Sequence, residues 1–316
     1  MERDTNSSLK NKVWIWASLC LLLTLGYAFS SGIWVVSYFL GIALALCLTI
    51  FFWRSKRYGL IGAVFLAALF YALRGGNSVV FLSKCLLPAL ILSLGLKHKR
   101  NPSLIIFLAI IPHLVILGLT VAHYGDIVFI FRDQLGELAQ RIAGVFEIFG
   151  INAIVLQTKI FSIFDTLAQL IFGFELLSSW VEVFLIYLLI QLIGDKLGWD
   201  TIKLTRFGLW HSQERFGWVA LLSLVLFLVG GKLFEIVSKN AALVFGFWYT
   251  VVGFSISEYF FGKSKVNMWI KILFYVFVLV TQILSFVLLS LLGFFDSWLD
   301  FRKLGKKSLS NKGVNI

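Results

Sequence analysis

The stretch "MWIKILFYVFVLVTQILSFVLLSLLGF", residues 268–294, decides the fold class of this chain. It is apolar almost throughout, and Lys271 is its only charged residue. A helix needs about 20 apolar residues to cross a bilayer. The run is continuously apolar rather than alternating, which is typical of membrane helices and not of membrane barrels. The stretch therefore predicts helix within lipid.

Further apolar runs of similar length fill most of the remaining chain. They are residues 13–30, 33–53, 58–73, 79–96, 104–122, 167–194, 218–234 and 241–261. Of 316 residues, 59% are hydrophobic and 14% are charged, whereas a soluble domain has roughly 45–50% apolar and about 25% charged residues. We therefore expect an all-α polytopic transmembrane helical bundle, forming a single integral membrane domain over residues 1–316, with lipid as its solvent.

The basic residues lie in short clusters between the apolar runs. The clusters include "RSKR" at 54–57, "KHKR" at 97–100 and a basic tail at 302–316. The positive-inside rule places such clusters in the cytoplasm, so the net charge of +12 indicates membrane topology, and we expect no nucleic-acid partner. Nine simple passes cannot put both termini in the cytoplasm. We expect about eight crossings, with a re-entrant or missing one at 13–53 or 124–164.

Residues 124–164 differ in kind from the apolar runs. Leu135, Leu138, Ile142 and Phe146 recur at helical spacing, and charged residues occupy the other faces. This pattern predicts an amphipathic segment at the membrane interface. It is interpreted either as a plain surface connector or as a lid or partner-docking helix.

One face of the run at 167–194 carries polar residues. Glu175, Ser178, Ser179 and Glu182 are spaced three, four and seven apart and therefore share a helix face. Charges within a bilayer are costly and face the protein interior or water. We interpret this face as one wall of a polar cavity; the alternative is interhelical hydrogen bonding with snorkelling near helix ends.

Other apolar runs contain isolated ionisable residues. Lys84 precedes Pro88 by one turn, Glu258 lies late in the run at 241–261, and His113 follows Pro112. Lys84 is available to a glutamate or to an anionic ligand, whereas a histidine beside a proline is more typical of a packed core. The substrate-binding candidates are Glu175, Ser179, Glu182, Lys84 and Glu258.

No catalytic motif accompanies these residues. The sequence lacks H-E-x-x-H, G-x-S-x-G and P-loop patterns, and its three cysteines have no metal-ligand spacing. We expect neither catalytic residues, nor a metal, nor a cofactor. Asp296 and Asp300, with Arg302 and Lys303 beside them, are interpreted as a solvated helix end.

Small residues predict close helix packing. Gly59, Ala63 and Ala67 recur every fourth residue, and Gly41 and Ala45 repeat this spacing. Such faces let helices approach closely. The set at 59, 63 and 67 is interpreted either as packing within this bundle or as a helix-docking face for another membrane subunit.

Four stretches together suggest a family. They are "RYG" at 57–59, "CLLPALILSLGLKHKR" at 85–100, "NAALVFGFWYTVVGFSISEYFF" at 240–261 and "LLGFFDSWLDFRK" at 291–303. The chain resembles the YybS-like family of bacterial polytopic membrane proteins of unknown function, which is distantly similar to the S components of energy-coupling-factor transporters. The resemblance implies the bacterial cytoplasmic membrane, an unknown small-molecule ligand, and docking on a membrane coupling subunit with ATPases.

Three functions follow as hypotheses. The first is an S-component-like subunit that captures or transports a small molecule. The second is a non-catalytic membrane scaffold in cell-shape or envelope assembly. The third is an enzyme acting on a lipid-linked substrate, which no feature of the sequence specifically indicates.

Overall fold

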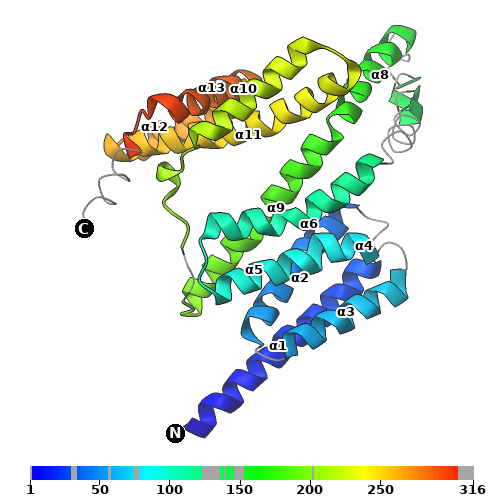
Figure 1. The fold of residues 1–316 in the computed structure, drawn as a ribbon, viewed down its shortest axis with the longest axis vertical. Helices are drawn as coiled ribbons and strands as arrows, with labels where there is room; N and C mark the ends of the chain where they lie inside the picture. Colours follow the sequence, from blue (N-terminus) through cyan, green and yellow to red (C-terminus); the bar gives the residue numbers. More distant parts are fainter. Residues whose placement is uncertain are drawn as a thin grey trace. The chain divides into compact units, whose positions relative to one another are not determined.

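A computed structural model describes the fold, over residues 2–29, 34–55, 58–74, 78–122, 136–138, 140–142, 144–145, 153–200 and 203–304. Figure 1 shows helices throughout, and no strand occurs within these ranges. The prediction of an all-α helical bundle is confirmed. Most of the predicted amphipathic segment at 124–164 and most of the basic tail, from residue 305 on, lie outside the described residues.

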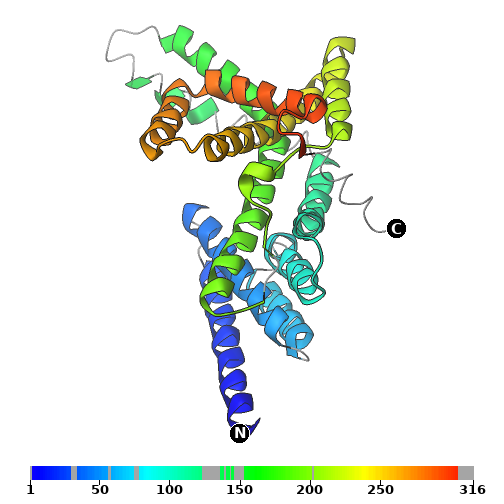
Figure 2. The ribbon, with the colours of Figure 1, turned by 90° about the vertical axis from the view of Figure 1, so that its left-hand side faces the viewer.

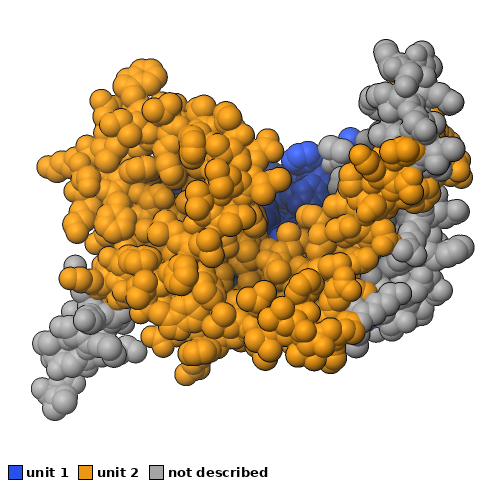
Figure 3. Space-filling model, turned by 90° about the horizontal axis from the view of Figure 1, so that it is seen from above, with its two compact units in different colours: residues 1–124, 175–203 blue, residues 125–174, 204–316 orange. Residues whose placement is uncertain are grey.

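The chain divides into two compact units. Unit 1 comprises residues 1–124 and 175–203, and unit 2 comprises residues 125–174 and 204–316. Figure 3 distinguishes them by colour. One boundary falls inside a long helix, so this helix contributes its first residues to unit 2 and the rest to unit 1. Each unit is described by itself.

Unit 1 is built around a central helix. Its elements are α1 (Glu2–Phe29), α2 (Trp34–Arg54), α3 (Tyr58–Arg74), α4 (Ser78–Phe81), the π-helix η3 (Leu82–Leu86), α5 (Leu87–Lys97), α6 (Pro102–Ala122) and most of α9 (Ile171–Lys196). Helix α2 contacts α1, α3, η3 and α5. Its Leu44 and Leu48 are fully buried, because the helix is apolar on every side and is surrounded by other helices.

Small residues let neighbouring helices of unit 1 approach closely. A Cβ added at Gly41 would lie 3.4 Å from the Tyr27 ring, and one added at Gly59 would lie 2.9 Å from the Ser55 hydroxyl. Gly59 and Ala63 are buried, whereas Ala67 is half-buried. Gly59 and Ala63 therefore pack inside this bundle, and a docking role for the set of Gly59, Ala63 and Ala67 stays a prediction.

Unit 2 contains a closely packed helix pair. Its elements are α8 (Ala153–Gln169), the start of α9, the 3-10 turn η4 (Phe207–Leu209), α10 (Glu214–Val229), α11 (Lys232–Lys263), α12 (Met268–Thr281) and α13 (Ile283–Leu299). Gly253 of α11 and Gly293 of α13 bring these two helices into backbone contact. A Cβ would lie 2.2 Å from the Leu289 carbonyl oxygen at the first position and 2.1 Å from that of Tyr249 at the second.

The run at 268–294 is helical, as predicted, but it forms two helices rather than one. Helices α12 and α13 meet at Gln282 with a bend of 115°, which Figure 2 shows where the orange helix turns into the red-orange one. Gln282 has φ 34° and ψ −92°, values that no helix can hold. The bend lets α13 pack along α11 through Gly253 and Gly293. The α12–α13 pair is therefore a broken span or a re-entrant hairpin. Charge counting had suggested an irregular crossing at 13–53 or 124–164 instead.

Four helical stretches within the described residues are long and apolar enough to cross a membrane. They are Val36–Arg54, Val79–Lys97, Ile171–Lys196 and Phe234–Lys263, and the bent α12–α13 pair makes up to five. Shorter apolar helices at Ile15–Ala28, Ile61–Leu73 and Pro102–Gly118 accompany them. The protein is thus a polytopic helical bundle, and the count of about eight crossings stays a prediction.

The contact between α11 and α13 gives a stability test. Gly253→Ala places a methyl group against the Leu289 backbone, which cannot rotate away as a side chain can. We expect a loss of about 1–3 kcal/mol, as for overpacked cores, measured as a lower unfolding temperature of the detergent-purified protein. Gly262→Ala on the same helix is the matched control, since nothing lies within 4 Å of its added Cβ. Equal unfolding temperatures for both variants would contradict this packing.

Candidate functional site

Lys84 lies in a π-helical turn within an apolar span. The turn η3 joins α4 to α5, and the Leu87 N–H donates to the Leu82 carbonyl five residues earlier. Pro88 gives the physical reason. It has no N–H to donate to the Lys84 carbonyl, and its ring would collide with that carbonyl in a regular α-helix. Single π turns inside helices occur frequently at functional sites.

An ion pair joins this turn to α9. The Lys84 Nζ lies 2.5 Å from the Glu175 Oε1, and about a third of each side chain is exposed. An ionisable group in a membrane span is costly unless it is paired or lines a water-filled space. The sequence suggested a glutamate as one partner for Lys84, and the structure shows which one.

Glu182 lies two turns further along α9 and is 5% exposed. Its carboxylate makes no hydrogen bond or ion pair with the residues that the structure describes. The Ser179 hydroxyl, one turn before it, donates instead to the Glu175 carbonyl at 2.8 Å. Lys84 and Glu175 are close enough to act on Glu182 electrostatically. Among the described residues, Glu182 is therefore a buried carboxylate whose neighbouring cation, Lys84, is already paired.

His113 of α6 belongs to the same region of unit 1. It is 4% exposed, and the charges of Lys84 and Glu175 act on its ring. The Ala109 carbonyl faces the ring, but neither ring nitrogen makes a well-formed hydrogen bond to the described residues. Sequence reasoning assigned His113 to the core and missed this neighbourhood, because no spacing along the chain relates α6 to η3 and α9.

These four side chains, Lys84, His113, Glu175 and Glu182, form what we call the ionisable cluster. It contains two carboxylates, one ammonium group and an imidazole, so one carboxylate has no cationic partner when both are ionised. A group that brings positive charge or donates hydrogen bonds would complete it. Among the described residues, no set of three metal-ligating side chains occurs.

Glu258, the remaining candidate, belongs to unit 2. Its Oε1 accepts from the Lys271 Nζ at 3.0 Å, and its Oε2 accepts from the Tyr275 hydroxyl at 3.3 Å. Both partners come from α12, so this carboxylate links α11 to α12. The structure brings Lys84, Glu175, Ser179 and Glu182 into unit 1 and leaves Glu258 in a separate ion pair.

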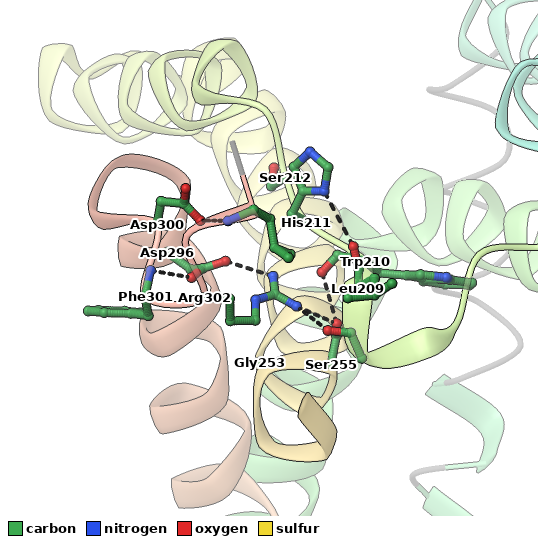
Figure 4. A network of polar contacts seen from close by, with 12 residues as sticks. Leu209, Trp210, His211, Ser212, Gly253, Ser255, Asp296, Asp300, Phe301 and Arg302 are labelled. Carbon is green, nitrogen blue, oxygen red and sulfur yellow. Dashed lines mark hydrogen bonds and ion pairs between the residues drawn. The ribbon is translucent and has the colours of Figure 1, made fainter. Parts of the chain in front are cut away.

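A second polar cluster, at the end of α13, corrects the interpretation of a solvated helix end. The Arg302 side chain is fully buried and that of Asp296 nearly so, and the Arg302 Nη2 donates to the Asp296 Oδ2 at 2.7 Å. The Arg302 Nη1 donates to the Gly208 carbonyl and to the Ser255 Oγ, each at 2.8 Å. Figure 4 shows the guanidinium between Asp296 and Ser255.

This second polar cluster holds the residues after α13 against η4 and α11 of unit 2. Asp296 also accepts from the Phe301 N–H, and Ser255 contacts the carbonyls of Phe207 and Trp210. Arg302 thus connects α11, α13 and the turn η4. The partners are spread over nearly a hundred residues, so the sequence offered no signal for this arrangement beyond the charges themselves.

The long apolar helices and the paired charges within them define a multi-pass helical membrane protein. Residues 18–297 match the family described as "Predicted membrane protein (DUF2232)". The chain belongs to this family. No match was found among curated proteins or among solved structures.

The buried ion pair at the end of α13 gives a second test. Arg302→Gln leaves the Asp296 carboxylate buried without its cation, and removing one partner of such a pair costs about 3–5 kcal/mol. We expect a correspondingly lower unfolding temperature in detergent. Lys303→Gln is the control, because Lys303 is exposed.

The double variant Arg302→Met with Asp296→Leu separates pairing from packing. It removes both charges, and apolar replacements of buried pairs are often neutral. We expect it to be more stable than Arg302→Gln alone. If Arg302→Gln behaved like Lys303→Gln, the Arg302–Asp296 pair would contribute nothing to stability.

Proposed function

We propose that this protein is a membrane subunit that captures or transports a small molecule, in the manner of the S components that it distantly resembles. The ionisable cluster is the single observation that carries the proposal. Ionisable residues inside membrane spans commonly mark substrate or ion pathways. Here three elements of one unit bring such residues together, and one of these elements is a π turn.

The chemistry of the cluster suggests how a ligand would bind. Glu182 would accept hydrogen bonds from a cationic or donor group, since its carboxylate makes no hydrogen bond or ion pair with the described residues. Lys84 and Glu175 would hold each other in place, and either could exchange its partner for a charged group of the ligand. This favours a small polar ligand with at least one positively charged or hydrogen-bond-donating group.

The proposal extends to partners and location. We place the protein in the bacterial cytoplasmic membrane with its C-terminus in the cytoplasm, docked on a membrane coupling subunit with ATPases. Within the set Gly59, Ala63 and Ala67, Ala67 is the member that stays partly accessible. Docking through α3 would therefore use Ala67 and the exposed side chains three and four residues away on the same helix face, Val64 and Tyr71.

The scaffold alternative is less well supported. It was based on the amphipathic segment at 124–164, most of which lies outside the described residues. The third hypothesis, a membrane enzyme acting on a lipid-linked substrate, gains no specific support from the described residues.

Native mass spectrometry of the detergent-extracted complex tests the proposal. We expect the wild-type protein to retain a small molecule, a coupling subunit, or both. Glu182→Gln should reduce the bound small molecule at least tenfold, because the amide cannot supply the negative charge. Glu235→Gln is the control, since Glu235 is a half-exposed carboxylate paired with Lys239 in unit 2.

Two further measurements keep the outcome interpretable. The unfolding temperature of Glu182→Gln shows whether the variant is folded, and Lys84→Gln gives an independent perturbation of the same cluster. A wild-type complex with neither ligand nor partner would overturn the proposal. So would equal ligand retention in Glu182→Gln, Lys84→Gln and Glu235→Gln.

A further inference from the structure

A groove of about 940 Å³ runs along η3, α5 and α6 in unit 1. Its walls are almost entirely apolar and include Leu87 and Leu94 from α5, and Leu108 and Ile111 from α6. Each of these four side chains is between 39% and 54% exposed. The groove is therefore open on a surface that lipid covers in a membrane protein.

The packing of α5 against α6 gives the groove a fixed shape near its polar end. A Cβ added at Gly95 would lie 2.5 Å from Ile105, so the two helices approach closely there. The turn that follows α5 is held by hydrogen bonds from the Arg100 N–H to the Gly95 carbonyl and from the His98 N–H to the Leu94 carbonyl. His98 and Arg100 line the groove at this turn.

The polar end of the groove is positively charged. Lys99 pairs with Asp200, whereas the Arg100 guanidinium makes no ion pair with the described residues. Helix α6 begins at Pro102, directly after the same turn, and helix N-termini favour anions. An apolar groove that ends in an arginine, a histidine and a helix N-terminus is complementary to a molecule with a long apolar chain and an anionic head.

We propose that this groove binds one anionic glycerophospholipid. An acyl chain lies between Leu87 and Leu94 of α5 and Leu108 and Ile111 of α6. The phosphate contacts Arg100 and His98. The occupant is a lipid rather than a soluble anion because only one end of the groove is polar. Its head is anionic because basic groups between helices attract the acidic lipids of the cytoplasmic leaflet.

The site is independent of the proposed transport function but adjoins the ionisable cluster. Ser83 and Pro112 line the groove, and they directly adjoin Lys84 and His113 in sequence. A bound acyl chain would therefore pack against the backbone that carries these two residues. Occupancy of the groove would stiffen the π turn and the part of α6 around Pro112.

Lipid retention measured by native mass spectrometry tests this site. The detergent-purified protein is mixed with phosphatidylglycerol or with phosphatidylcholine of the same chain length. We expect wild type to retain phosphatidylglycerol at least fivefold more than phosphatidylcholine. Arg100→Gln should remove this preference. Lys263→Gln should keep it, because Lys263 is an exposed basic residue at a helix end outside the groove.

A second variant tests the apolar part. Leu108→Trp fills the groove without changing its charge, and it should lower retention of both lipids by a similar factor. The unfolding temperature of each variant, measured without added lipid, identifies any that fails to fold. An arm with inorganic phosphate alone should leave the unfolding temperature of wild type unchanged.

Three results would overturn the proposal. One is equal retention of the two lipids by wild type. Another is an equal loss of phosphatidylglycerol in Arg100→Gln and Lys263→Gln, which would indicate general surface attraction. The third is stabilisation of wild type, but not of Arg100→Gln, by inorganic phosphate, which would make free phosphate the occupant.

Discussion

The hydrocarbon of a bilayer cannot hydrate a charge, and this constraint governs the arrangement of both units. A charge within a span is costly unless it pairs with another group of the protein or faces a water-filled space. Lys84 meets Glu175, Glu258 meets Lys271, and Arg302 meets Asp296. The first two pairs each join two elements of one unit, and Arg302 reaches η4 and α11 through Gly208 and Ser255. These contacts therefore add polar links to the apolar packing within each unit.

Irregular backbone geometry positions the residues of two of these pairs. Pro88 prevents a regular helix and widens one turn into η3, the turn that carries Lys84. Gln282 ends α12 and lets α13 fold along α11, where Gly253 and Gly293 allow backbone contact. The end of α13 then carries Asp296 and Arg302 to the turn η4. In both units a departure from ideal helix geometry positions the charged side chains.

The two sites proposed in unit 1 share one framework and differ in chemistry. The ionisable cluster has a buried carboxylate and suits a small polar ligand. The groove along α5 and α6 is apolar with a basic end and suits a lipid. The region from η3 to α6 contributes to both, through Lys84 and His113 on one side and through Ser83 and Pro112 on the other. Membership of a family defined by its membrane character fits a protein whose described polar sites lie within or beside its spans.

The sequence by itself determined the all-α class, the positions of the apolar helices and the shared face of Glu175, Ser179 and Glu182. It could do so because hydropathy and helical periodicity are local properties. It could not give the partner of Lys84, the neighbourhood of His113 or the burial of Arg302, because each depends on residues distant in the chain. It also missed the bend at Gln282, since a polar residue within an apolar run does not by itself reveal a break. Tertiary structure decided these points, because the packing of distant segments determines which buried charges pair and where a helix breaks.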